Sequence, residues 1–336
     1  MIKGHGDDTY KYSNIRLNFS SNVYSHFNHE GLFAYLASRL SKVESYPEPV
    51  PMSLEKELAI ELGLKEENVC VTNGATEAIY LIAQAFRHNK TAILMPTFSE
   101  YKDACTLHEH TIYPIYSLQQ IPQQAEMVWL CNPNNPIGTV LPKDDLIRTF
   151  GNHPKTVFVV DASYAPFTEK AVVKSNEAAE MPNVLMLHSM TKEFSIPGLR
   201  LGYITGDEQL LTQIRLQRMP WSVNQLAIDA GHYALRHPEE FQFDLYALMQ
   251  ERQRVAECLT RLGCIDVWPS DTHILLCRLR FGNSADLKDF LAVEKGILIR
   301  DASNFDALGP DFFRIAIQTA KENDELIKAI EEWICM

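Results

Sequence analysis

Five short runs of apolar residues stand out between positions 68 and 188. They occupy residues 68–72 (NVCVT), 92–95 (AILM), 127–131 (MVWLC), 157–160 (VFVV) and 184–187 (VLML). Each run is hydrophobic throughout rather than alternating with polar residues, and segments of helical length separate them. Continuous runs of this kind are typical of strands that are buried on both faces of a parallel sheet. The pattern therefore predicts an α/β fold built on a large, mostly parallel sheet.

The rhythm changes after residue 238, where a long helical stretch extends to residue 263. A strand at 273–278, a helix near 284–295, strands at 296–300 and 313–317 and a final helix complete the chain. This succession predicts a smaller α+β domain. The first thirty or so residues show no βαβ pattern, so we place them beside it. The predicted large domain covers residues 32–235, and the small domain covers residues 1–31 plus 236–336.

Polar residues, glycines and prolines follow each of the five predicted strands. The segments are NGAT at 73–76, PTF at 96–98, NPNNP at 132–136, DASY at 161–164 and SMTK at 189–192. In open α/β sheets the ligand crevice lies outside the carboxyl ends of the strands. We therefore expect five segments that are distant in sequence to converge on one site.

The pair of Lys192 and Arg200 indicates a particular chemistry for that site. A lysine that attacks an aldehyde must be neutral, and neighbouring cations and partial desolvation lower its pKa as this requires. Arg200 and Ser189 are suited to holding a phosphate group. The alternative is a solvated lysine and arginine on a surface loop, and the apolar residues on both sides of the pair argue against it.

Three further segments each have a structural as well as a functional interpretation. Residues 74–76 begin a predicted helix and can bind a phosphate through backbone N–H groups, or Thr76 can simply cap the helix. Asp161 ends an apolar run, where it suits a protonated pyridine nitrogen, a helix cap or a structural salt bridge. Tyr164 can bond a phenolic oxygen of the same ring or the backbone. In NPNNPIG at 132–138, two prolines and a glycine hold Asn135 at the strand edge, although turns of this composition are common.

Charge and composition narrow the classes of partner. The 336-residue chain has a formal net charge of -12 and no Lys/Arg-rich run, which makes nucleic acid a poor candidate. The seven cysteines are scattered and indicate reduced core residues, and no stretch is apolar enough for a membrane span. With no apolar segment at the start, we expect a cytoplasmic protein. His108, Glu109 and His110 do not share a helix face, so we expect them at the surface and expect no metal site.

These motifs resemble the fold-type I pyridoxal-phosphate enzymes of the class I/II aminotransferase group. The resemblance extends over nearly the whole chain and is greatest to the L-threonine O-3-phosphate decarboxylases of cobalamin synthesis, which are relatives of the histidinol-phosphate aminotransferases. The segments that carry it are NPNNPIG, DASY, SMTK with its arginine eight residues later, GHG at 4–6, NFSSN at 18–22, the run 191–203, RMPWSVN at 218–224 and GILIR at 296–300.

The resemblance implies a role for each residue around the cofactor ring. Lys192 would bind pyridoxal 5'-phosphate as a Schiff base, and Asp161 would bond the pyridinium nitrogen. Asn135 and Tyr164 would bind the phenolic oxygen, and Phe98 would stack on the ring.

It also implies a phosphate site and a second subunit. Ala75, Thr76, Ser189 and Arg200 would hold the cofactor phosphate. Tyr46 matches a tyrosine that reaches this phosphate from the neighbouring subunit, so the resemblance implies a homodimer.

For the substrate, a small phosphorylated amino acid, Arg314 would bind the carboxylate and Arg300 would lie near the phosphate. His5 and Asn22 would line the same mouth. In relatives a second glycine often stands at the position of Asp7, which affects the contacts of the N-terminal segment.

Three functions remain open at this stage. The resemblance favours a decarboxylase that converts L-threonine O-3-phosphate to (R)-1-aminopropan-2-yl phosphate. An aminotransferase of the histidinol-phosphate type is the alternative within the same family. A non-catalytic regulatory protein that binds the cofactor is the alternative from another class, and the presence of Lys192 argues against it.

Overall fold

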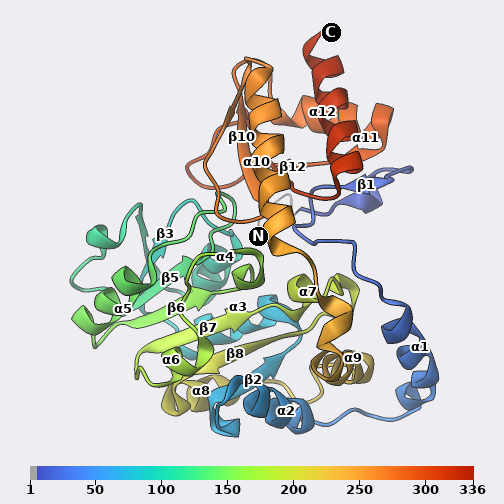
Figure 1. Ribbon diagram of the computed structural model, residues 1–336. Coiled ribbons are helices and arrows are strands. Elements are labelled where there is room, and N and C mark those ends of the chain that lie inside the picture. Colours follow the sequence, from blue (N-terminus) through green and yellow to red (C-terminus); the bar gives the residue numbers. More distant parts are fainter. Residues whose placement is uncertain (1–5) are drawn as a thin grey trace.

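The computed structural model describes residues 6–336, which form twelve α-helices and three β-sheets in two units (Figure 1). The helices are α1 (Glu30–Ser38), α2 (Met52–Leu62), α3 (Gly74–Ala85), α4 (Glu100–Leu107), α5 (Lys143–Asn152), α6 (Ser175–Ala179), α7 (Met190–Glu193), α8 (Glu208–Arg215), α9 (Gln225–Arg236), α10 (Leu245–Arg261), α11 (Ser284–Lys295) and α12 (Ala320–Ile334). The strands are β1 (Leu17–Asn18), β2 (Val69–Thr72), β3 (Lys90–Leu94), β4 (Thr111–Ile115), β5 (Met127–Cys131), β6 (Val157–Asp161), β7 (Val184–His188), β8 (Gly202–Gly206), β9 (Ile265–Val267), β10 (Ile274–Leu279), β11 (Ile297–Leu298), β12 (Arg300–Asp301) and β13 (Phe312–Ala316).

The larger unit is built on a seven-stranded sheet with the order β2-β8-β7-β6-β5-β3-β4. The strands β3, β4, β5, β6 and β7 are parallel to one another, which confirms the predicted α/β fold with a mostly parallel sheet. Every residue of β5 is buried, because helices cover both faces of the sheet and leave no position for a polar side chain. The five predicted apolar runs correspond to β2, β3, β5, β6 and β7.

Two strands of this sheet, β4 and β8, have no counterpart among the predicted runs. β8 is antiparallel to both of its neighbours, with Gly202 opposite Thr72 of β2 and Tyr203 opposite His188 of β7. Its amino end therefore lies at the same edge as the carboxyl ends of the parallel strands. This reversal brings Arg200, two residues before β8, to the edge where the crevice lies.

The smaller unit holds an antiparallel sheet, β12-β13-β10-β9, packed with α10, α11 and α12. α10 extends from the larger unit toward this sheet (Figure 1). The predicted helix at 284–295 is confirmed as α11. The start of the chain also joins this unit, because β1 pairs in parallel with β11 through Leu17 and Ile297. The proposed residue limits of the two domains stay a prediction.

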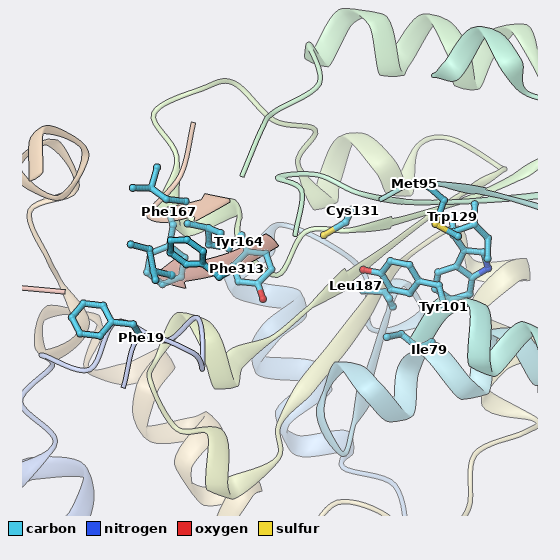
Figure 2. Close-up of a cluster of buried hydrophobic side chains, with 14 of the residues drawn as sticks. Phe19, Ile79, Met95, Tyr101, Trp129, Cys131, Tyr164, Phe167, Leu187 and Phe313 are labelled. Atoms are coloured by element: carbon cyan, nitrogen blue, oxygen red, sulfur yellow. The ribbon is translucent and has the colours of Figure 1, made fainter. Parts of the chain in front are cut away.

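The hydrophobic core continues from the large sheet to the small unit. Figure 2 shows Tyr101 and Trp129 beside the sheet and Tyr164, Phe167 and Phe313 farther toward the small unit, all within one cluster of buried side chains. The rings of Tyr101 and Trp129 are stacked, with centroids 5.2 Å apart. Within residues 6–336, none of the helices combines the length and the apolar composition needed to cross a membrane.

His110 corrects one expectation, because its side chain is buried rather than at the surface. Its Nδ1 lies 2.7 Å from the Thr91 hydroxyl, and its Nε2 lies 2.9 Å from the carbonyl oxygen of Ala83. Both ring nitrogens have partners, so His110 supports the junction of α3, β3 and β4. In the described part of the chain, no group of three His, Cys, Asp or Glu side chains is arranged to hold a metal ion.

Candidate active site

A cavity of about 680 Å³ opens where the carboxyl ends of the parallel strands face the small unit. Twelve of the fourteen predicted site residues line it: Asn22, Ala75, Thr76, Phe98, Asn135, Asp161, Tyr164, Ser189, Lys192, Arg200, Arg300 and Arg314. They come from eight separate segments of the chain, with residues 189–200 counted as one. The convergence follows from the sheet, since parallel strands present their carboxyl ends at one edge.

The other two predicted residues lie elsewhere. Tyr46 does not line the cavity, and its side chain is 84% exposed beside Trp221, with ring centroids 5.2 Å apart. His5 lies outside the described residues. The predicted contacts of both residues with the cofactor and substrate stay predictions.

Lys192 reaches the cavity from α7, directly after the carboxyl end of β7. Its Nζ donates a hydrogen bond to the carbonyl oxygen of Ser21 at 2.5 Å. Burial, with a contribution from the nearby charge of Arg314, lowers the pKa of the amine from 10.5 to about 8. A larger fraction of Lys192 is therefore neutral near pH 8 than for a solvated lysine, as attack on an aldehyde requires.

Asp161 is buried at the end of β6, and both of its carboxylate oxygens have partners. Oδ1 accepts the backbone N–H of Ser163 at 2.9 Å, and Oδ2 accepts the hydroxyl of Tyr101 at 2.5 Å. Asp161 is not a helix N-cap, and no basic residue makes an ion pair with it within residues 6–336. A buried carboxylate with no ion-pair partner within 4.0 Å among the described residues suits a positively charged ring nitrogen.

Tyr101 is one of the cavity-lining residues that the sequence analysis did not single out. Its hydroxyl is fully buried against Asp161, and burial together with the carboxylate raises its pKa well above the ordinary value. Tyr101 therefore stays protonated and donates to Asp161. The available signal was its position three residues after Phe98, and the two rings lie edge to face with centroids 5.9 Å apart.

Arg314 on β13 crosses the cavity and fixes Asn135. Its Nη1 donates to Oδ1 of Asn135 at 2.6 Å, and its Nη2 donates to the Ser20 carbonyl oxygen at 2.6 Å. Because the amide oxygen of Asn135 is occupied, its NH₂ group is the part left to donate to a ligand. Among the described residues Nε of Arg314 has no partner, although the side chain is buried. Such a group is costly unless a ligand or water satisfies it.

Tyr164 and Asn22 form a second pair at this end of the cavity. Nδ2 of Asn22 donates to the Tyr164 hydroxyl at 2.9 Å. Burial raises the pKa of Tyr164, so its hydroxyl remains a proton donor. With Asn135 and Tyr164 both donating, this region fits a phenolate oxygen.

The opposite end of the cavity fits a phosphate group. α3 begins at Gly74 after the cap residue Asn73, so the alternative with Thr76 as the N-cap is wrong, and the N–H groups of the first turn are oriented toward a ligand. The Ser189 hydroxyl lies 2.7 Å from that of Thr191. Arg200 is exposed, and a Cβ at Gly74 would lie 2.8 Å from its Nη2. Glycine at position 74 therefore allows this arginine to approach the helix start.

The residues present thus fit pyridoxal phosphate: an amine of lowered pKa, a buried carboxylate, two donors for a phenolate oxygen and a helix start for the phosphate. When bound, this cofactor withdraws electrons from the Cα of an amino acid and weakens the bonds there.

Comparison with known proteins defines the class. The model of the aminotransferase class I and II family matches residues 14–330, and the chain belongs to this family. It is therefore an enzyme, and its cofactor is pyridoxal phosphate.

Individual relatives include two kinds of enzyme. The chain is similar to a solved L-threonine-O-3-phosphate decarboxylase from Porphyromonas gingivalis, with 35% identity, a TM-score of 0.92 and coverage of 95% of this chain and 100% of that one. It is 28% identical to the threonine-phosphate decarboxylase of Salmonella typhimurium, over 94% of this chain and 90% of the relative. It is also 28% identical to the histidinol-phosphate aminotransferase of Methanocaldococcus jannaschii, over 89% and 84%.

Proposed function

We propose that the protein is a decarboxylase of L-threonine O-3-phosphate that forms (R)-1-aminopropan-2-yl phosphate, a step of cobalamin synthesis. The observation that carries this proposal is a pair of buried arginines in one cavity. Arg300 of β12 and Arg314 of β13 are direct cross-strand partners, and both line the cavity together with Lys192. Adjacent guanidinium groups suit a ligand with two anionic groups a few bonds apart. A short phosphorylated amino acid has this form.

The surroundings of Arg300 and Arg314 support a different binding role for each. Arg314 lies deeper, next to Asn135, and suits the carboxylate. Nη2 of Arg300 donates to Oδ1 of Asn304 at 2.7 Å, and its guanidinium lies over the ring of Phe305, which also lines the cavity. Arg300 suits the phosphate. With both anions held, the two arginines would fix the orientation of the Cα substituents toward the cofactor, and this orientation would decide which bond the cofactor weakens.

The alternative is an aminotransferase that acts on histidinol phosphate or a similar amine, and relatives of comparable identity have this activity. The two reactions differ in what Lys192 does. In transamination its amine removes the Cα proton, whereas in decarboxylation the carboxylate leaves and a proton is delivered to Cα. The purified holoenzyme with carboxyl-labelled phosphothreonine and no keto acid should release labelled CO₂. Turnover only when a keto acid is added would favour the aminotransferase.

We also propose a homodimer in which Tyr46 completes the phosphate site of the partner. Tyr46 and Trp221 are exposed aromatic residues in adjacent segments, joined by the Trp221 N–H bond to the Pro49 carbonyl oxygen. Large apolar side chains are exposed on the same segments: Leu40, Val43, Met52 and Met219. Apolar exposure on this scale is typical of an interface. Arg200, the exposed member of the phosphate site, is where a residue from a partner could contribute.

A further inference from the structure

Residues 6–12 begin at the wall of the cavity, which Gly6 and Asp7 line, and are attached to helix α11 of the small unit. The carboxylate of Asp8 accepts two hydrogen bonds from Nζ of Lys288, at 2.7 and 2.8 Å, and both residues are buried. The Tyr12 hydroxyl donates to Oδ1 of Asp289 at 2.7 Å. Positions 8 and 288 are thus joined in the interior, although 280 residues separate them.

The other side of this segment is part of the cavity wall. Gly6 and Asp7 line the cavity together with Ser20 and Arg300. The backbone N–H of Asp7 donates to the Ser20 hydroxyl at 3.1 Å. A Cβ at Gly6 would lie 3.2 Å from Cδ of Arg300 and 3.2 Å from the Ser20 carbonyl oxygen. The segment therefore packs directly against Arg300, with little room for a side chain at position 6.

Helix α11 also supports the strand that carries Arg300. The Ser284 hydroxyl donates to Oδ1 of Asp301 at 2.5 Å, and Asp301 follows Arg300 in β12. Ser284 and Lys288 are four residues apart, so they lie on one face of the helix. One helix face thus holds both the Arg300 strand and the segment packed against it.

The contact with Lys288 is the one that fastens the segment. Burial by itself would raise the pKa of Asp8, but Lys288 and Lys11 together hold it below its ordinary value. The side chain of Lys288 is 10% exposed and that of Lys11 is 48% exposed, with Lys11 Nζ 3.0 Å from the same carboxylate. Breaking a buried pair leaves an uncompensated charge, whereas an exposed pair contributes little. The chain thereby offers a matched control, since one carboxylate has a buried and an exposed lysine.

We propose that Asp8 and Lys288 are positioning residues that hold Gly6 and Asp7 against Arg300, and that this closed wall gives the site its preference for a phosphorylated over an unphosphorylated amino acid. The inference rests on the proposed function, because it takes Arg300 as the group that binds the substrate phosphate. With the wall in place Arg300 is 7% exposed, and an ion pair formed there is shielded from water. Without the wall the same ion pair would be solvated and weak.

The test compares Lys288→Met with Lys11→Met in the holoenzyme. Binding of O-phospho-L-threonine and of L-threonine is followed by the change in cofactor absorbance. We expect K288M to weaken phosphothreonine binding about tenfold or more and threonine binding less than about twofold, and K11M to change both by less than about twofold. D8N should reproduce K288M, and K288R should restore part of the preference. A K288M enzyme with the wild-type preference would overturn the inference.

Hydrogen exchange provides a second measurement that needs no substrate. The backbone amides of residues 6–12 should exchange faster in K288M than in the wild type, and at the wild-type rate in K11M. Unchanged exchange in a folded K288M protein would overturn the anchoring role. A wild-type holoenzyme that does not distinguish the two amino acids contradicts the proposed function. A wild type that does distinguish them, with K288M unaltered, contradicts only the present inference.

Discussion

The chemistry of Lys192 depends on its surroundings more than on its identity. Burial and Arg314 lower the pKa of its amine to about 8, and only the deprotonated amine attacks an aldehyde. We predict that the rate at which the apoenzyme captures pyridoxal phosphate rises with pH, with a midpoint near pH 8 rather than 10.5. Stopped-flow absorbance measures this rate, and K192A should not form the covalent adduct. A midpoint above about pH 10 would mean that the amine is solvated.

Tyr101 acts indirectly, through its hydrogen bond to Asp161. Y101F removes the 2.5 Å hydrogen bond to the buried carboxylate of Asp161, which is then less well positioned. We predict that kcat/KM falls about tenfold to a hundredfold, since hydrogen bonds to charged groups contribute about 1.5–3 kcal/mol. The absorbance spectrum of the bound cofactor should shift with it. An unaltered spectrum and kcat/KM would assign Tyr101 a packing role only.

Prediction from sequence worked best for residues whose polarity contrasts with their neighbours. Lys192 and Asp161 follow apolar strands, where an ionisable group is conspicuous, and the cavity contains both. Tyr101 gave no such contrast, because an aromatic residue in a helix is ordinary core material. The pair of Asp8 and Lys288 could not be predicted, because nothing in the sequence links two residues that are 280 positions apart.

At the level of elements, the parallel strands could be predicted because burial on both faces leaves a continuous apolar signature. β8 escaped because three residues between two glycines make a short signal and its direction is opposite to that of its neighbours. The place of Arg200 at the cavity could be predicted from its motif, although the antiparallel strand that brings it there could not.

A buried ion pair joins α2, β2 and the segment after α8. Nη1 of Arg218 donates to Oε1 of Glu55 at 2.6 Å and to the Val71 carbonyl oxygen at 3.2 Å, and both side chains are less than 10% exposed. We predict that R218M lowers the free energy of unfolding by about 3–5 kcal/mol, because Glu55 is left buried without its counter-ion.

The control is R148A, since Arg148 pairs with Asp145 at the surface, where its side chain is 67% exposed. We expect a loss of less than about 1 kcal/mol in this case. Denaturant unfolding of the two variants gives the comparison directly. Equal losses would show that burial does not govern the contribution of these pairs.

At the scale of the whole molecule, the proposed dimer implies that one chain alone does not hold a complete active site. Tyr46 is exposed and does not line the cavity of its own chain, so the proposed dimer predicts complementation. K192A and Y46A should each be impaired alone, whereas hybrids formed by mixing them contain one site with both residues. Activity should recover to about a quarter of the wild-type value in an equal mixture. No recovery, together with a monomeric mass in solution, would refute the shared site.

A decarboxylase and an aminotransferase break different bonds at Cα, and the identity of the product in D₂O distinguishes them directly. The holoenzyme is incubated with O-phospho-L-threonine in D₂O without a keto acid, and product and remaining substrate are examined by NMR and mass spectrometry. We predict 1-aminopropan-2-yl phosphate with one deuterium on the former Cα, because one proton from solvent replaces the carboxylate. Recovered substrate that has exchanged its Cα hydrogen for deuterium, with no amine product, would contradict the proposed decarboxylase activity.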